Sequence, residues 1–217
     1  MCKKYAIILV RGGDFMSQER ILPHVRQSDS GRNCGAACLK MICKYYKIGK
    51  KLSLKDFTKN VSIRLPNGLL SCRNNLMLSY ARKLGFHCYV VTAKDAQRTI
   101  TACLDNNVEV IINYHPYEFS DCGHFSWVSY ADDKFVYLND PAKDLPSGQN
   151  YPIEWESLKQ RMIAGSPLSE FPRNNTMLIL YLPNQEISLS EEHQLPEFLV
   201  DETIATLNPD DTWCPIH

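Results

Sequence analysis

Apolar residues in the first half of the chain recur mainly at the spacing of an α-helix. In residues 34–46 they fall on one helical face, and Gly49 follows as a stop signal. Residues 53–61 open on a helix-capping serine, residues 67–85 end at a glycine, and residues 93–107 form a further helical segment. The first half is therefore predicted to consist mostly of helices.

The second half of the chain changes to short apolar runs of strand length. The turn sequence ADDK joins two of these runs, as expected for a β-hairpin, and one more helix is predicted at residues 151–163. Strands are expected at residues 86–92, 108–115, 124–132, 134–140 and 174–183, with extended segments at residues 3–10 and 20–25. Helices followed by antiparallel strands indicate an α+β fold rather than an alternating α/β pattern.

The charge of the chain is distributed unevenly, although its net value is zero. No lysine or arginine follows Arg173, whereas eight acidic residues do. We therefore predict a domain at residues 1–183 and an acidic C-terminal tail at residues 184–217. The tail is a candidate for binding a partner or secretion machinery, because clustered glutamates near the C-terminus are similar to the export signals of some bacterial type IV secreted effectors.

Several classes of protein do not fit the sequence. No apolar run approaches the length of a membrane span, and no basic stretch interleaved with aromatic residues indicates nucleic-acid binding. The nine cysteines are an odd number, and the N-terminus lacks the pattern of a secretory signal. Reduced thiols and a cytoplasmic protein are therefore expected, with export into a host cell by a non-Sec system as an alternative.

Cys34 differs from the other cysteines in its position. It lies at the start of the first predicted helix, where the helix dipole and free N–H groups favour a thiolate. Gly35 and Ala36 follow, and their small side chains leave room for a substrate. Cys38 and Cys43 lie deeper in the helix and are expected to pack in the core. Cys34 is therefore the candidate nucleophile.

A cysteine nucleophile needs a base, and the base needs a group that orients it. His124 begins one strand of the predicted hairpin, and Asp140 ends the other, so the two side chains are expected to face each other. Asn139 and Asp132 are alternatives to Asp140. Gln27, upstream of Cys34, could donate to a developing oxyanion together with the Cys34 N–H group.

These motifs resemble a known family. Gln27, the "CGAACLKM" that starts at Cys34, "GHFSWVSY" around His124 and "VYLNDPA" around Asp140 resemble the papain-like cysteine peptidases of the bacteriocin-processing, double-glycine type. The resemblance covers most of residues 20–182, and no transporter region follows, so stand-alone relatives are the better match. It implies a Cys-His-Asp triad with Gln27 at the oxyanion site.

The resemblance also implies a papain-like fold, with the nucleophile helix packed on an antiparallel sheet, and cleavage of an amide bond in a protein or peptide through a thioester, without a cofactor. Six residues separate Gln27 from Cys34, where the family usually has five, so Gln27 reaches the oxyanion only if this loop bulges. Asn33 also stands where the bacteriocin-processing enzymes often carry aspartate.

Other functions remain open at this point. A protein deamidase or an acyltransferase of the same fold would use the same residues, for example in a secreted bacterial effector. A non-catalytic binding module is a further alternative, with or without a zinc ion held by Cys34, Cys38, Cys122 and His124. The spacing of these four residues does not match a common zinc module, and no metal site is expected.

Overall fold

The protein is described here from a computed structural model, which covers residues 22–28, 32–66, 68–93, 95–116, 123–163, 176–184 and 199–200. The helices are α1 (Cys34–Tyr45), α2 (Leu54–Val61), α3 (Asn74–Lys83), α4 (Ala96–Asp105) and α5 (Trp155–Ile163). The first predicted strand, residues 3–10, and almost all of the acidic tail lie outside these ranges.

The strands form one large sheet and one small hairpin. The hairpin pairs β1 (Ser62–Arg64) with β2 (Leu70–Cys72). The large sheet has the order β7-β6-β5-β4-β8-β3-β9, and each neighbouring pair is antiparallel. Its strands are β3 (His87–Thr92), β4 (Glu109–Tyr114), β5 (His124–Ala131), β6 (Phe135–Asn139), β7 (Tyr151–Glu154), β8 (Thr176–Tyr181) and β9 (Leu199–Val200).

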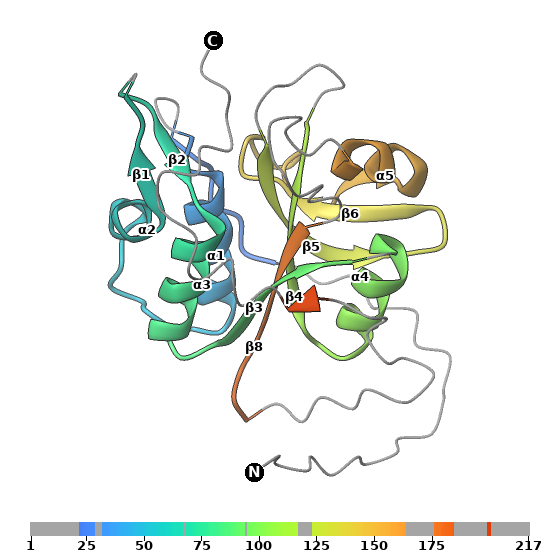
Figure 1. Cartoon of the computed structure of the whole chain (residues 1–217), viewed down its shortest axis with the longest axis horizontal. Coiled ribbons are helices and arrows are strands. Elements are labelled where there is room, and N and C mark those ends of the chain that lie inside the picture. The colour runs from blue at the N-terminus through green and yellow to red at the C-terminus, as the bar shows by residue number, and fades with distance from the viewer. Residues whose placement is uncertain are drawn as a thin grey trace.

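Helices cover both faces of the large sheet, as Figure 1 shows, with α1, α2 and α3 on one side and α4 and α5 on the other. Successive side chains of a strand point to opposite faces, so neighbouring residues of β4 enter different cores. Ile111 joins Trp127 in the core below α1 and α3, whereas Val110 and Ile112 join Leu158 in the core below α4 and α5. The antiparallel sheet and the packed helices confirm the predicted α+β, papain-like fold.

Polar side chains fix the starts of two helices. Ser53 and Asp56 form a reciprocal capping box at α2, in which the Ser53 hydroxyl accepts the Asp56 N–H and the Asp56 carboxylate accepts the Ser53 N–H. Asp95 accepts the Arg98 N–H at the start of α4. Each cap satisfies a helix N–H group that has no partner within the helix.

Three segments differ from the sequence prediction. Residues 67–85 were predicted to be one helix, but β2 occupies Leu70–Cys72 and α3 begins only at Asn74. Residues 151–163 likewise begin as β7 before α5. The described part of residues 20–25 has no regular secondary structure. In the first two segments pairing with a neighbouring strand overrides local helical spacing, because the sheet offers backbone partners that an isolated segment lacks.

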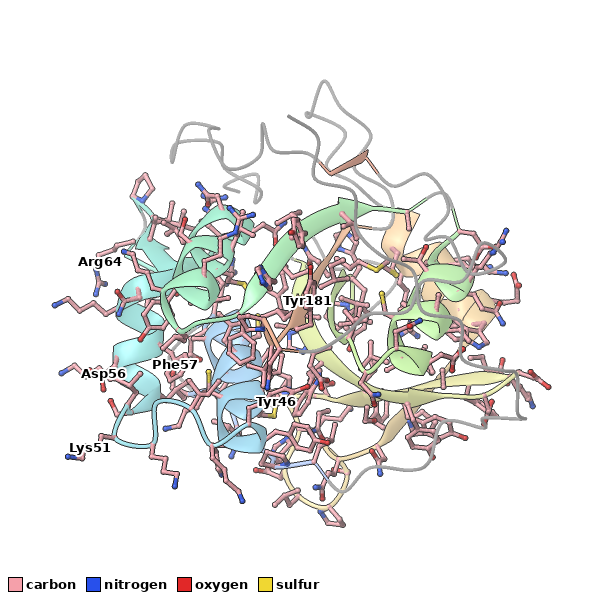
Figure 2. All side chains as sticks on the ribbon, turned by 90° about the horizontal axis from the view of Figure 1, so that it is seen from below. Tyr46, Lys51, Asp56, Phe57, Arg64 and Tyr181 are labelled. Atoms are coloured by element: carbon pink, nitrogen blue, oxygen red, sulfur yellow. The ribbon has the colours of Figure 1, made fainter. Side chains whose placement is uncertain are left out.

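A buried carboxyl group joins α1 to the sheet. Glu109, on β4, is fully buried and accepts hydrogen bonds from the Tyr46 hydroxyl at 2.7 Å and from the Trp127 indole N–H at 2.8 Å. Tyr46 follows the last residue of α1, and it projects where the helices meet the sheet (Figure 2). The C-terminal end of α1 is therefore tied to both β4 and β5.

Candidate active site

The β5–β6 hairpin brings His124 and Asp140 together. Trp127 pairs with Asn139 in the sheet, so Asp140 lies just beyond β6 and His124 lies at the start of β5. The His124 Nε2 atom is 2.7 Å from Asp140 Oδ1, and both residues are buried. This is the contact expected from the hairpin in the sequence, and it leaves the His124 Nδ1 atom available on the other side of the ring.

The glycine before His124 packs closely against β4. A Cβ atom on Gly123 would lie 2.5 Å from Asn113 Oδ1, so the end of the Asn113 side chain would have to move to admit one. The neighbouring Tyr114, which pairs with His124 across β4 and β5, places its ring edge-on to the imidazole with centroids 5.7 Å apart. The imidazole is therefore positioned by the sheet as well as by Asp140.

The Asp140 carboxylate is held in its charged form. Burial raises its pKa, but the hydrogen bond with His124, the charge of His124, the Ala142 N–H at 2.9 Å and nearby Lys143 outweigh that effect, so the pKa lies below its usual value. A charged carboxylate beside Nε2 favours a proton on that nitrogen.

The two alternatives to Asp140 lie elsewhere. Asp132 sits in the turn between β5 and β6, where it accepts the Phe135 N–H at 2.7 Å and the Tyr137 hydroxyl at 2.9 Å. Asn139 donates to the carbonyl oxygen of Pro23 at 3.2 Å. Of the three candidates, Asp140 is the one with a hydrogen bond to His124.

Cys34 begins α1 and lies against the start of β5. Its thiol interacts with the backbone N–H of Phe125, the residue after His124, and the residue is only 7% exposed. One turn later, the Cys38 thiol donates to the Phe125 carbonyl oxygen at 3.4 Å. The first two turns of α1 are thus aligned with the strand segment that carries the imidazole.

The pKa of the Cys34 thiol departs from the sequence expectation. A hydrogen bond with the side chain of Cys72 and burial raise it well above the ordinary value, whereas the helix start was expected to favour a thiolate. The physical reason is that the first-turn N–H groups of Gly35 and Ala36 interact with the Cys72 sulfur instead. The helix N-terminus therefore stabilises negative charge on the neighbouring cysteine.

Sequence reasoning missed Cys72 as a member of this site. It ends β2 and is partly buried, 38 positions after Cys34. The sequence predicts one helix over residues 67–85, and such a helix gives no reason to place Cys72 near the start of α1. Strands of three residues are too short to show an alternation that would mark this position in the sequence.

Gln27 lies close to the His124–Asp140 pair through its backbone. Its N–H donates to the carbonyl oxygen of Pro141 at 2.8 Å, and its side-chain Oε1 is buried without a hydrogen-bond partner among the described residues. Asn33, the residue before Cys34, accepts the Ser28 N–H at 3.0 Å. Residues 29–31 between them lie outside the described ranges, so whether the longer loop lets Gln27 reach the oxyanion stays a prediction.

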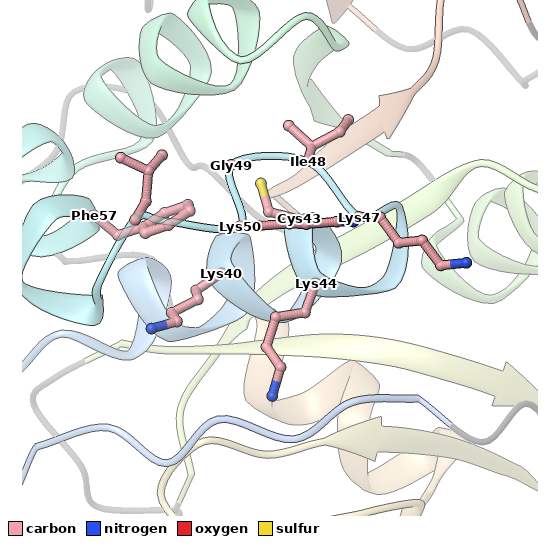
Figure 3. A pocket seen from close by; sticks show the side chains of 9 residues that line it. Lys40, Cys43, Lys44, Lys47, Ile48, Gly49, Lys50 and Phe57 are labelled. Atoms are coloured by element: carbon pink, nitrogen blue, oxygen red, sulfur yellow. The ribbon is translucent and has the colours of Figure 1, made fainter.

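A separate cavity lies at the other end of α1. It measures about 360 Å³ and is lined by Lys40, Lys44, Lys47 and Lys50 around an apolar floor that includes Phe57 (Figure 3). Cys43 also lines it, and burial raises the pKa of that thiol to about 12. Neither His124 nor Asp140 borders this cavity.

The zinc alternative depends partly on Cys122, which lies outside the described residues. Among those that are described, no cluster of three or more histidine, cysteine, aspartate or glutamate side chains is arranged to hold a metal ion. None of the described helices is long and apolar enough to cross a membrane.

Comparison with known proteins identifies the class to which this fold and these motifs belong. The sequence model of the Peptidase C39 family matches residues 22–147, more than half of the chain. The protein therefore belongs to the Peptidase C39 family, and it is a papain-like cysteine peptidase. None of the curated proteins matches its sequence.

Solved structures of peptidase domains share the fold. A double-glycine-motif protease from an AMS/PCAT transporter, in complex with its leader peptide, is 20% identical with a TM-score of 0.51, over 73% of this chain and 90% of that one. The peptidase domain of Streptococcus ComA, a bifunctional ABC transporter, is 20% identical with a TM-score of 0.50, over 73% and 96%. A C39-like peptidase from Bacillus anthracis is 14% identical with a TM-score of 0.52, over 74% and 94%.

Proposed function

We propose that the protein hydrolyses a peptide bond in a protein or peptide through a thioester on Cys34, with His124 and Asp140 completing the triad. The observation that carries this proposal is the buried 2.7 Å contact between His124 Nε2 and Asp140 Oδ1, directly beside the strand residue that Cys34 contacts. Membership of a peptidase family supports it independently.

The proposed reaction begins with proton transfer from the Cys34 thiol to His124 Nδ1 as the sulfur attacks the carbonyl carbon. Because the pKa of Cys34 is raised, His124 acts as a general base during attack rather than as a partner of a preformed thiolate. The imidazolium then protonates the leaving nitrogen, and water hydrolyses the thioester. Asp140 keeps the ring oriented and stabilises its positive charge.

The proposed substrate class is a peptide cleaved after a double glycine. Support comes from the similar protease that was crystallised with its leader peptide.

Mass spectrometry of peptides incubated with the protein tests the proposal. A peptide containing Gly-Gly should be cut after the second glycine, and a matched peptide with Ala-Ala at those positions should be cut far more slowly. An unbroken peptide with a side-chain amide converted to an acid would indicate a deamidase instead. Transfer of an acyl group to an added amine, without hydrolysis, would indicate an acyltransferase.

Gln27→Ala tests the proposed oxyanion donor. Removing one such donor typically lowers kcat by about 10²–10³-fold, and we expect a loss in that range with little change in KM, because the donor acts on the transition state. Gln27→Glu is the matched variant, since it keeps the size of the side chain but has no N–H group. Wild-type kcat in both variants would assign the second donor to another residue.

A further inference from the structure

The β1–β2 hairpin places a second thiol against the start of α1. Cys72 is the last residue of β2, and its backbone pairs with Ser62. A Cβ atom on Gly35 would lie 3.0 Å from the Cys72 Cβ atom, so the backbone that follows Cys34 runs directly along this side chain. Both cysteines are free thiols.

The two thiols interact across this approach, and each changes the pKa of the other. The Cys72 sulfur also lies 3.3 Å from the Ser62 hydroxyl and 3.6 Å from the carbonyl oxygen of Arg32. Cys72 is partly exposed, whereas Cys34 is nearly covered. Of the two, Cys72 is therefore the member of the pair nearer the surface.

The proton is shared unequally between the two thiols. Hydrogen bonds from Cys34, from Ser62 and from the N–H groups of Ala36 and Gly35 lower the pKa of Cys72 to about 7, although burial opposes them. The pKa of Cys34 rises in turn. Near neutral pH Cys72 is thus partly thiolate, the form that reacts with peroxides.

We propose that Cys34 and Cys72 form a reversible oxidation site at which a peroxide converts the two adjacent thiols into a disulfide. One sulfur attacks a peroxide oxygen, the O–O bond breaks, and hydroxide leaves, which gives a sulfenic acid. The second sulfur attacks the first, and the S–O bond breaks with release of water. In total two thiols lose two electrons and two protons, and hydrogen peroxide is reduced to two molecules of water.

The other described cysteines do not offer such a pair. Burial raises the pKa of Cys43, Cys88 and Cys103 to about 12, so their thiolates are scarce. Cys38 lies near Cys34 but is fully buried and donates its proton to the Phe125 carbonyl oxygen. A disulfide requires two sulfurs to approach to about 2.05 Å, and Cys72 lies against the backbone that directly follows Cys34.

The consequence for activity rests on the proposed function. If Cys34 is the nucleophile, the disulfide removes it from catalysis, and a thiol reductant restores it. The disulfide itself can be detected without any substrate. One experiment can therefore refute the oxidation site without refuting the proposed function, and the reverse also holds.

Peptide mapping of peroxide-treated protein tests the proposal. Fully reduced wild type is exposed to hydrogen peroxide, alkylated and digested with trypsin, which yields residues 33–40 and 65–73 as separate peptides. We expect these two peptides to be linked, with the loss of two hydrogen atoms, and to separate after dithiothreitol. The pH at which Cys34 becomes reactive toward the alkylating reagent should also be lower in Cys72→Ser than in wild type, because Cys72 raises the pKa of Cys34.

Residues 33–40 contain Cys38 as well, so matched variants identify the linked sulfur. The link should persist in Cys38→Ser and be absent in Cys72→Ser. A link that disappears only in Cys38→Ser, or oxidation of Cys34 to sulfinic acid in wild type without any link, would overturn the proposal. Because the wild-type result needs no variant, a folding defect in Cys72→Ser would leave the test intact. A link combined with full peptide cleavage by Cys34→Ala would refute the proposed function alone.

Discussion

Cys34→Ala is expected to lower kcat/KM for peptide cleavage by at least about 10³-fold, because no thioester can form without the sulfur and only binding and oxyanion contacts would remain. The fold should be retained, since the change removes one atom at a helix start. The measurement is the rate of product formation by mass spectrometry, together with circular dichroism to confirm folding.

Two control variants make this result specific. Cys38→Ala lies one turn further along α1 and removes a thiol that contacts the same strand residue, so it should retain cleavage. Cys72→Ala addresses the rival nucleophile, because Cys72 has the lower pKa of the contacting pair. Loss of cleavage in Cys72→Ala, with cleavage retained in Cys34→Ala, would assign the nucleophile to Cys72.

His124→Ala is expected to reduce kcat by about 10²–10⁴-fold, the range that general acid–base catalysis contributes. The rate at which a thiol-reactive inhibitor labels Cys34 should also fall in His124→Ala, since in the proposed mechanism the imidazole removes the thiol proton. Asp140→Asn is the milder change, because the amide oxygen can still accept from His124 Nε2 and from the Ala142 N–H group. Equal cleavage in wild type and His124→Ala would place the base elsewhere.

The same carboxylate should appear in the pH dependence of stability. The folded-state pKa of Asp140 is depressed, so its contribution is complete above the unfolded pKa of about 4 and is lost as the pH falls through the lower folded value. Urea unfolding of wild type and Asp140→Asn should therefore differ most near neutral pH and converge in acid. A difference that grows on acidification would show that the carboxylate is not held in its charged form.

The hairpin and the first helix could be predicted from the sequence because their signals are local. Residues 34–46 carry helical spacing that ends at a glycine, and the ADDK turn fixes which residues of the next two strands meet. His124 and Asp140 are both within that hairpin, so their contact followed from the turn alone. The expected contact between His124 and Asp140 is present in the structure, and the catalytic role of the two residues stays a prediction.

The Cys72 contact could not be predicted in this way. The β1 and β2 strands have only three residues each, too few to show an alternation, and both are formed by pairing with each other rather than by local preference. The unequal proton sharing of the two cysteines follows from where the first-turn N–H groups point. The direction of these N–H groups relative to Cys72 depends on how α1 packs against β2, and residue spacing in the sequence does not indicate it.

The buried Glu109 side chain has a consequence for the alignment of the two halves of the molecule. It fastens the end of α1 to β5 through Tyr46 and Trp127, while Cys34 and Cys38 contact β5 at the other end of the helix. Sliding α1 by one residue would move it about 1.5 Å and break both sets of contacts. A misplacement of about 1 Å can cost about 10²-fold in rate. If Cys34 and His124 act as proposed, a carboxyl group at the far end of α1 therefore helps to set the accuracy with which sulfur and imidazole are aligned.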